Sequence, residues 1–276
     1  MRFLVLLAFA TLACGCACRR LQPLPGVVGV GSGGTYVWIL RTAHGAALVD
    51  AGLDVSAQSV LDELRAEGLT ADDVHTILLT HGHIDHWAGA LKFPRALVRA
   101  GAGDVPLIRR EQECGAWLPR TLIAWFGPKL PPPPRLVGLE GDARLDVDGE
   151  PVDAVLLPGH TPGSAAYLFR GILFTGDSLF RSGSHGLAAA NPMFTDDLAL
   201  NRRSLEKLRA LAFTRAADGH CGVTGNARAK LEAFLSPPRA RGRALTMKQL
   251  ESCGGGVPAL AWDQAGGASP RSGAPN

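Results

Sequence analysis

The sequence predicts a layered α/β domain, with sheets inside and helices outside. Its 276 residues, 46% of them hydrophobic and 19% charged, are enough to bury a large core within a single domain. Short apolar runs bounded by glycine, proline or polar residues recur in both halves of the chain, and such runs are typical of strands. Segments with apolar residues at helical spacing separate these runs, so strands and helices are expected to pack in layers.

The first half of the chain is expected to supply mainly strands. Two of them, YVWILR and AALVDAG, are joined at TAHG and are predicted to form a hairpin. A helix should follow, because Asp54 can cap its first turn, apolar residues recur at helical spacing, and Gly68 stands where a C-terminal cap is expected. The strands predicted in this half are residues 36–41, 46–52, 74–80, 95–100 and 134–139.

The second half alternates strands with two predicted helices. Residues 197–212 form an amphipathic helix, with Leu198, Leu205 and Leu208 on one face, and residues 226–235 form a last helix facing the core. The strands predicted here are residues 151–159, 164–170 and 171–177, with a further strand end in TRAADGHCGV.

Between the two halves, residues 116–136 are apolar but interrupted by prolines, so they cannot form one regular element. They could cover a substrate or lie near a membrane. They could equally be a surface loop whose aromatic residues pack on the domain.

The two ends of the chain are expected to lie outside the domain. The first residues carry an early arginine, an apolar run too short to span a membrane, and then small residues and cysteines, which predicts a secretory signal. This leader resembles the signal of bacterial lipoproteins, in which a cysteine after a small residue is acylated, and Cys14 and Cys16 both fit. The predicted divisions are a leader at 1–18, a linker at 19–32, the folded domain at 33–252 and a disordered tail at 253–276.

Composition limits the partners that can be expected. A formal net charge of +3 gives no strong field for nucleic acid, and no nucleic-acid partner is predicted. The lipoprotein resemblance implies an exported protein, anchored to the bacterial cell envelope through an N-terminal lipid, whereas an ordinary secretory signal would leave it periplasmic or secreted. Cys114, Cys221 and Cys253 are too scattered for a disulfide framework or a Cys-x-x-Cys zinc site, and Cys221 is expected to be a buried, unreactive thiol. The sequence does not predict the oligomeric state.

The stretch ILLTHGHIDHWAGAL contains the residue types that bind metals. Three histidines and one aspartate lie within residues 81–86, directly after a predicted strand. Neutral imidazole and carboxylate both bind zinc, and a loop allows alternate side chains to turn toward one point. His81 and His83 can therefore face one ion while Asp85 and His86 face another.

Three later segments repeat one layout, in which an apolar strand is followed by a single polar residue next to glycine. They are LLPGHTPGS with His160, ILFTGDSLF with Asp177 and AADGHCG with His220. Five of the eight histidines thus stand at the ends of predicted strands, where the active sites of α/β sheets collect. Together with the first stretch, these residues predict a metal site built from segments far apart in the chain.

This pattern resembles the metallo-β-lactamase superfamily, whose members carry a His-x-His-x-Asp-His run followed by a distant His, then an Asp, then a His. The resemblance covers most of the chain between its two ends. It implies a four-layer αββα sandwich with two metal ions, usually zinc (Zn2+), between the sheets, although other divalent metals or iron could occupy the same residues. The implied ligands are His81, His83 and His160 for the first ion, Asp85, His86 and His220 for the second, and Asp177 as the bridge.

The activity that this resemblance implies is hydrolysis of a small-molecule substrate. Two adjacent ions lower the pKa of a shared water, so that a bridging hydroxide can attack a carbonyl carbon in an ester, thioester or lactone. Asp85 is expected to orient this hydroxide as well as to bind metal, which makes it the predicted catalytic residue. His185, in the loop after Asp177, is a candidate substrate contact.

The choice of branch within the superfamily stays open at this point. FTGDSLF and PGHTPGS most resemble the glyoxalase II branch of thioesterases, but the residues after GDSLF depart from it. One site can host many reactions on one fold. The alternatives are a β-lactamase, a sulfur dioxygenase with a single iron, and a protein that binds metal without catalysis.

Overall fold

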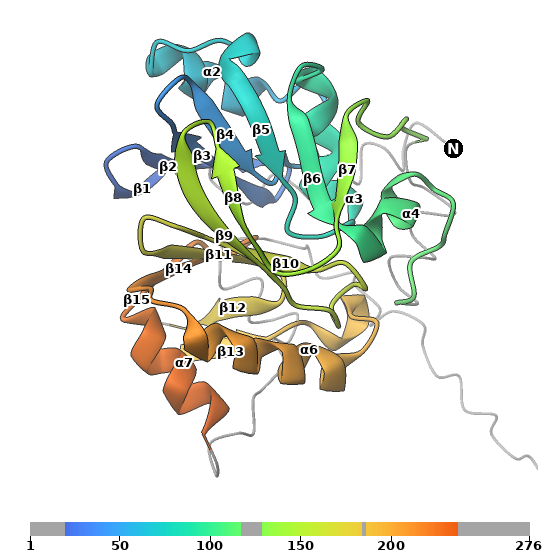
Figure 1. Ribbon diagram of the computed structural model, residues 1–276, viewed down its shortest axis with the longest axis vertical. Coiled ribbons are helices and arrows are strands. Elements are labelled where there is room, and N and C mark those ends of the chain that lie inside the picture. The colour runs from blue at the N-terminus through green and yellow to red at the C-terminus, as the bar shows by residue number, and fades with distance from the viewer. Residues whose placement is uncertain (1–19, 117–128, 184–185, 237–276) are drawn as a thin grey trace, which may run out of the picture.

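Two β-sheets stacked face to face form the centre of the molecule, and helices cover their outer faces (Figure 1). This arrangement is the four-layer αββα sandwich that the sequence predicts. The computed structural model describes residues 20–116, 129–183 and 186–236. The predicted leader and tail, with Cys14 and Cys16, lie outside these residues, as does most of the apolar segment before Leu130.

The first sheet contains seven strands, in the same order as in the chain. Strands β1 to β4 pair antiparallel, whereas β4 to β7 run parallel to one another. Parallel strands end at the same edge, so the loops after β5 and β6 leave the sheet on one side. The strands are β1 (Leu21–Leu24), β2 (Val27–Ser32), β3 (Thr35–Arg41), β4 (Ala46–Val49), β5 (Val74–Leu78), β6 (Leu97–Gly101) and β7 (Leu136–Leu139).

The second sheet contains six strands in the order β15-β14-β11-β10-β9-β8, and β12 pairs with β13 in a separate small sheet. Within the six-stranded sheet, β11 and β14 are parallel and the other neighbours are antiparallel. The strands are β8 (Ala143–Val147), β9 (Glu150–Leu156), β10 (Ala165–Phe169), β11 (Ile172–Gly176), β12 (Leu179–Ser182), β13 (Gly186–Ala189), β14 (Arg215–Asp218) and β15 (Val223–Gly225).

The helices are short and their ends follow from local sequence. Gly68 follows α2 with a φ of 74°, as a glycine in a C-terminal cap should, and the Asp54 carboxylate accepts a hydrogen bond from Gln58 N. Asp197 caps α6 by accepting from Leu200 N, but the predicted helix then continues as a 3₁₀ turn over Leu205–Ala210. The helices are α2 (Gln58–Ala66), α3 (Ile84–Trp87), α4 (Val105–Ile108), α6 (Leu198–Ser204) and α7 (Ala227–Leu235).

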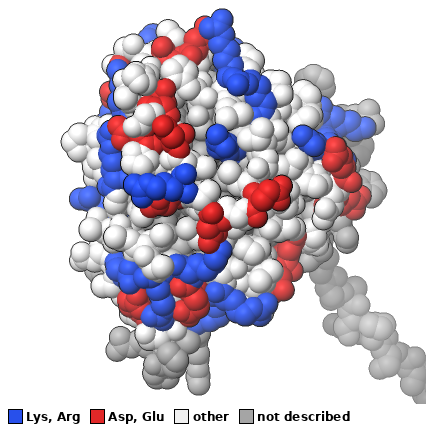
Figure 2. All heavy atoms as spheres, in the orientation of Figure 1, with Lys and Arg blue, Asp and Glu red and all other residues white. Residues whose placement is uncertain are grey.

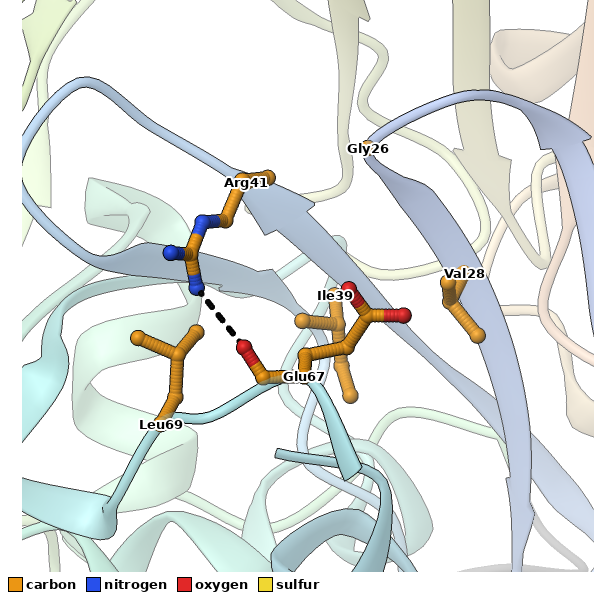
Figure 3. A pocket seen from close by; sticks show the side chains of 6 residues that line it. All are labelled: Gly26, Val28, Ile39, Arg41, Glu67 and Leu69. Atoms are coloured by element: carbon orange, nitrogen blue, oxygen red, sulfur yellow. Dashed lines mark hydrogen bonds between the residues drawn. The ribbon is translucent and has the colours of Figure 1, made fainter. Parts of the chain in front are cut away.

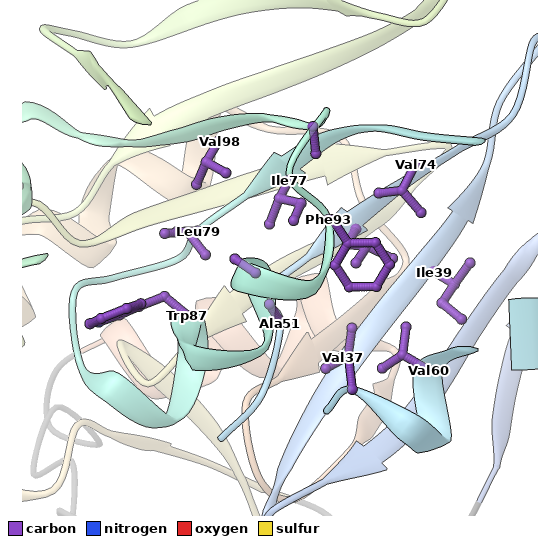
Figure 4. Close-up of a cluster of buried hydrophobic side chains, with 14 of the residues drawn as sticks. Val37, Ile39, Ala51, Val60, Val74, Ile77, Leu79, Trp87, Phe93 and Val98 are labelled. Atoms are coloured by element: carbon purple, nitrogen blue, oxygen red, sulfur yellow. The ribbon is translucent and has the colours of Figure 1, made fainter. Parts of the chain in front are cut away.

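Three apolar layers hold these elements together. On the outer face of the first sheet, Val37 and Ile77 pack with Val60 of α2 and with Phe93 (Figure 4). The two sheets enclose a second cluster that includes Trp38, whose indole lies 5.7 Å from the Phe174 ring. A third cluster joins the second sheet to the 3₁₀ turn and α7. Because both faces of the central strands are buried, their sequences are continuously apolar rather than alternating.

The predicted linker at 19–32 is wrong, because residues 21–32 form β1 and β2. The glycine-rich composition of this stretch suggested a flexible connection, but the glycines serve packing. A β-carbon on Gly29 would overlap the ring of Trp38, its partner on β3. Glycine at this position therefore lets the indole lie flat against the sheet. Strands β8, β12, β13 and β15 were also not predicted.

The cysteines differ from expectation at one position. Cys221 takes part in a disulfide bond, so the prediction of an unreactive thiol there is wrong, whereas Cys114 is a buried thiol. Among the described residues, no helix is long and apolar enough to cross a membrane.

The charged side chains of the two signs are interspersed on the face drawn in Figure 2. Near α6 and α7, for example, Arg209 pairs with both Glu206 and Glu232.

Candidate metal centre

The seven ligand-type residues predicted from the sequence come together between the two sheets. Each follows the carboxyl end of a strand: one stretch after β5, in which His81 and His83 lie in a loop and Asp85 and His86 in α3, and single residues after β9, β11 and β14. The first sheet therefore contributes four residues of the cluster and the second sheet three. Their ligand atoms form overlapping groups, each spanning no more than 4.8 Å, which are His81–His83–His160, His81–His86–Asp177 and Asp85–His86–His220.

The first group consists of three buried imidazoles. His83 Nδ1 lies 3.0 Å from His81 Nε2 and 3.1 Å from His160 Nε2. Each of the three side chains is at most 6% exposed. These three ring nitrogens point at one another, and a single proton cannot form hydrogen bonds with all of them. Together they form a trigonal face that a metal ion can cap.

The second group combines two imidazoles with two carboxylates. His86 Nε2 lies 3.6 Å from an Asp85 oxygen and 3.5 Å from Asp177 Oδ1. His220 Nε2 lies 3.2 Å from Asp177 Oδ2 and 3.8 Å from Asp85 Oδ2. Asp177 Oδ2 is also 3.9 Å from His160 Nε2, so this carboxylate faces both groups.

Hydrogen bonds on the outer side fix the tautomers of His81 and His160. Thr80 Oγ1 donates to the Asp50 carboxylate, so it must accept from His81 Nδ1, 3.1 Å away. Thr195 Oγ1 donates to a backbone carbonyl and likewise accepts from His160 Nδ1. In both rings the Nε2 lone pair is therefore left to face the cluster.

The other three imidazoles are oriented in the same way by different acceptors. His86 Nδ1 donates to Asp50 Oδ2 at 2.8 Å, and His220 Nδ1 donates to the carbonyl of Gly34 at 3.0 Å. His83 points its Nδ1 inward instead, and its Nε2 lies 3.3 Å from the Cys114 sulfur. All five rings thus point one nitrogen toward the centre.

Two buried atoms at the centre show that these residues fit metal ions. Within the described chain, His86 Nε2 and Asp177 Oδ1 have no hydrogen-bond partner. A buried polar atom without a partner is costly, and metal coordination is one way to satisfy it. Five oriented imidazole nitrogens and two carboxylates form the donor set that zinc and similar ions prefer.

The two groups differ in charge. Burial, reinforced by the neighbouring histidines, lowers the pKa of His81 and of His160 well below the ordinary value. Burial also lowers the pKa of His86, but Asp50 and the other carboxylates outweigh it and raise the pKa to about 9. At His220 burial is likewise outweighed, here by Asp177, and the pKa rises to about 10. Burial raises the pKa of Asp177, but the attraction of His220 and His86 is stronger and brings it below its usual range.

Sequence reasoning missed the carboxylates that support the ligands. Asp50 is 1% exposed and accepts hydrogen bonds from Thr80 and His86. Asp218 is also buried and accepts from the backbone N–H groups of His220 and Gly222. Asp50 could have been found, because it ends an apolar strand close to a glycine, which is the layout of the predicted ligands.

Other features lie outside this centre or outside the described residues. His185, the predicted substrate contact, is not among the described residues. A small pocket at the opposite end of β3 contains none of the ligand-type residues, and Arg41 there donates to the carbonyl of Glu67 (Figure 3). Its lining residues are Gly26, Val28, Ile39, Arg41, Glu67 and Leu69.

Comparison with known proteins decides the family. Residues 30–220 match the family model described as the metallo-beta-lactamase superfamily. The chain belongs to the metallo-β-lactamase superfamily. The fold and the ligand pattern of this superfamily member therefore agree with the resemblance seen in its sequence.

Curated relatives of this superfamily member include hydroxyacylglutathione hydrolases. It is 33% identical over 178 residues to the enzyme of Aeromonas hydrophila, covering 64% of this chain and 56% of the relative. It is 34% identical over 178 residues to that of Synechococcus sp., covering 60% and 55%. The chain thus spans little more than half the length of these relatives.

Solved structures share the fold. A metallo-beta-lactamase family protein of Thermus thermophilus superposes with a TM-score of 0.57 at 26% identity, covering 80% of this chain and 77% of that one. The Rm3 metallo-beta-lactamase superposes with a TM-score of 0.60 at 21% identity, covering 88% and 93%. At the lower identity the likeness concerns the fold alone.

Proposed function

We propose that this protein is a dinuclear zinc hydrolase that attacks the carbonyl carbon of a small-molecule ester, thioester or lactone. The observation that carries the proposal is the convergence of seven ligand-type side chains whose imidazoles are all oriented from behind. The ligands of such a site are preorganised for metal binding.

The two groups of residues would hold the two ions. His81, His83 and His160 would bind the first, and Asp85, His86 and His220 the second, with Asp177 shared between them. When bound, two divalent ions lower the pKa of a shared water to near neutral and polarise a carbonyl oxygen.

Asp85 is the residue that we assign to the reaction itself. Its side chain is 33% exposed, against 12% for Asp177, so it is the carboxylate of the centre most open to an incoming water and substrate. Its backbone carbonyl accepts from Thr35 Oγ1 at 2.9 Å, which fixes the start of α3 against the β2–β3 turn. Asp85 can thus orient the attacking water and accept its proton.

The hydroxyacylglutathione hydrolase relatives support a thioester among the carbonyl substrates. Because the chain spans only about half of their length, the leaving group is left to experiment. Three alternatives would replace this proposal. They are hydrolysis of a β-lactam, an iron-dependent dioxygenation, and metal binding without catalysis.

The test combines metal analysis with a substrate panel. Wild type, Asp177→Ala and Asp142→Ala are compared for metal content and for turnover of thioester, lactone, aryl ester and β-lactam substrates. Asp142 is a matched control because it is exposed and pairs with Lys207 rather than with the centre. We expect wild type and the control to contain about two zinc ions per chain and to hydrolyse a substrate. Asp177→Ala should lose the bound zinc and the hydrolysis.

The other outcomes are equally informative. One iron per chain without hydrolysis would favour a dioxygenase. Full metal occupancy without turnover would favour a binding role, and turnover of the β-lactam alone would favour a lactamase.

We also propose that the protein is exported and anchored to the cell envelope by a lipid on Cys14 or Cys16. The disulfide at Cys221 supports export, because disulfides persist in oxidising compartments. Replacing both cysteines by serine should release the protein from the membrane fraction. A double variant that stays membrane-bound would refute the anchor.

A further inference from the structure

Asp104 lies where the two halves of the domain meet, beside the first group of histidines. It ends the 3₁₀ turn Ala102–Asp104 that follows β6, and it is 0% exposed. A fully buried carboxylate is costly unless several donors satisfy it.

Three donors satisfy the Asp104 carboxylate, and they come from two different loops. Oδ2 accepts from Gly82 N and from Thr161 Oγ1, each at 2.6 Å. Oδ1 accepts from Gly163 N at 2.7 Å. All three hydrogen bonds are short, as expected when an ionised oxygen is the acceptor.

Both loops carry ligands of the first group. Gly82 stands between His81 and His83, after β5 of the first sheet, whereas Thr161 follows His160 directly, after β9 of the second sheet. Ligands on separate sheets are not held in register by a common strand ladder. A backbone hydrogen bond from Ala165 N to Thr80 O joins the same loops nearby, but Asp104 bonds to residues adjacent to the ligands themselves.

Close backbone packing makes these contacts possible. A β-carbon on Gly163 would overlap the backbone of Asp104, and one on Gly101 would overlap the carbonyl of Gly163. The loop after β9 therefore lies directly against the turn after β6. Its approach is close enough for one short side chain to reach both ligand loops.

We propose that Asp104 is a positioning residue that sets the distance between the His81–His83 loop and His160, and thereby the affinity for the first ion. The inference rests on the proposed metal centre. An asparagine at this position would have the same shape, but its amide group would turn a donor toward a donor of one loop. At least one of the three hydrogen bonds would be lost, and the loops would separate.

The test compares Asp104→Asn with a control aspartate that also joins the two halves. Asp148 bonds to Thr42 and to His75 at the far ends of β9 and β5, away from the ligands. Zinc affinity of each metal-free protein is measured by competition with a chromophoric chelator. We expect Asp104→Asn to bind the first ion about 10-fold to 100-fold more weakly, the range typical when a residue that supports metal ligands is replaced. Asp148→Asn should bind it as tightly as wild type.

A spectroscopic measurement separates positioning from a general loss of structure. With Co²⁺ as the probe, the absorption bands of the first ion should change in Asp104→Asn and stay the same in Asp148→Asn. Thr161→Val removes one hydrogen-bond donor to the carboxylate and keeps the side-chain shape. It should also lower the affinity for zinc. This second variant serves as the test if Asp104→Asn does not fold.

Two outcomes would overturn the inference, and they are distinguishable. Equal zinc affinity in wild type and in the folded variants would refute the role of Asp104 while leaving the metal centre intact. A wild-type protein that takes up no divalent ion would overturn the proposed function, and the inference with it.

Discussion

The two groups of ligands should differ in how many protons leave when metal binds. At neutral pH the first group is uncharged, because burial and neighbouring imidazoles lower the pKa of His81 and of His160. In the second group, burial is outweighed by nearby carboxylates, which raise the pKa of His86 to about 9 and of His220 to about 10. Each of these two rings therefore holds a proton that a metal ion must displace.

The size of the effect follows from this count. Binding of the first ion should release close to zero protons from the ligands, and binding of the second should release at least about two. Affinity for the second ion should then rise about 100-fold for each pH unit between about pH 6.5 and 8.5, where both rings are still protonated in the metal-free protein. Affinity for the first ion should hardly change over the same range.

The assay is a stepwise zinc titration of metal-free protein in weak buffer with a pH indicator dye, repeated at several pH values with a competing chelator. Asp50→Asn provides the diagnostic variant, since Asp50 is the strongest single influence that raises the pKa of His86. Its second step should release fewer protons than wild type at about pH 8. Asp54→Asn, which alters only a surface turn before α2, should behave like wild type.

A first step that releases two protons, or a second step that releases none, would refute this assignment of charge. So would an Asp50→Asn protein whose proton count matches that of wild type. Either result would mean that the carboxylates around His86 do not hold its proton in the metal-free protein.

Three further changes test other parts of the structure. Asp85→Asn should lower kcat by about 100-fold or more while the first ion is retained, and unchanged turnover would exclude Asp85 from the reaction. Cys114→Ala removes the sulfur that lies next to His83 Nε2, and it should speed release of the first ion by up to about 10-fold. The release rate is measured by stopped-flow chelation, and an unaltered rate would show that the thiol does not orient this ring. Gly29→Ala should destabilise the fold by about 1–3 kcal/mol in urea unfolding, because its β-carbon would overlap an indole ring, while Gly141→Ala, with open space around it, should not.

Much of the fold could be predicted from local patterns. Residues 36–41 and 74–80 are apolar runs bounded by turn residues, and both became buried strands of the first sheet. The amphipathic spacing before Gly68 and after Asp197 correctly located two helices. Residues 21–32 were misjudged because their glycines looked like a linker, and only the indole of Trp38 lying over Gly29 explains why a strand needs glycine there.

The identity of the ligand-type residues could also be predicted, since His81, His83, Asp85 and His86 are adjacent in the sequence. Not all of their supporting residues could. Asp50 shares the strand-end layout of the ligands, but Asp104 is a single aspartate in an unrelated segment, and nothing local distinguishes it from a surface aspartate such as Asp54.

The sequence by itself therefore determined the family, the layered architecture and the residues of the candidate metal centre, because periodicity and ligand spacing are local properties of the chain. The tertiary structure decided which atom of each imidazole faces inward and which carboxylate holds it. That choice depends on hydrogen bonds between segments brought together only by folding, as when His220 meets the carbonyl of Gly34 and Asp104 meets both ligand loops. A side chain's burial and its partners, rather than its place in the sequence, make it a ligand or a support.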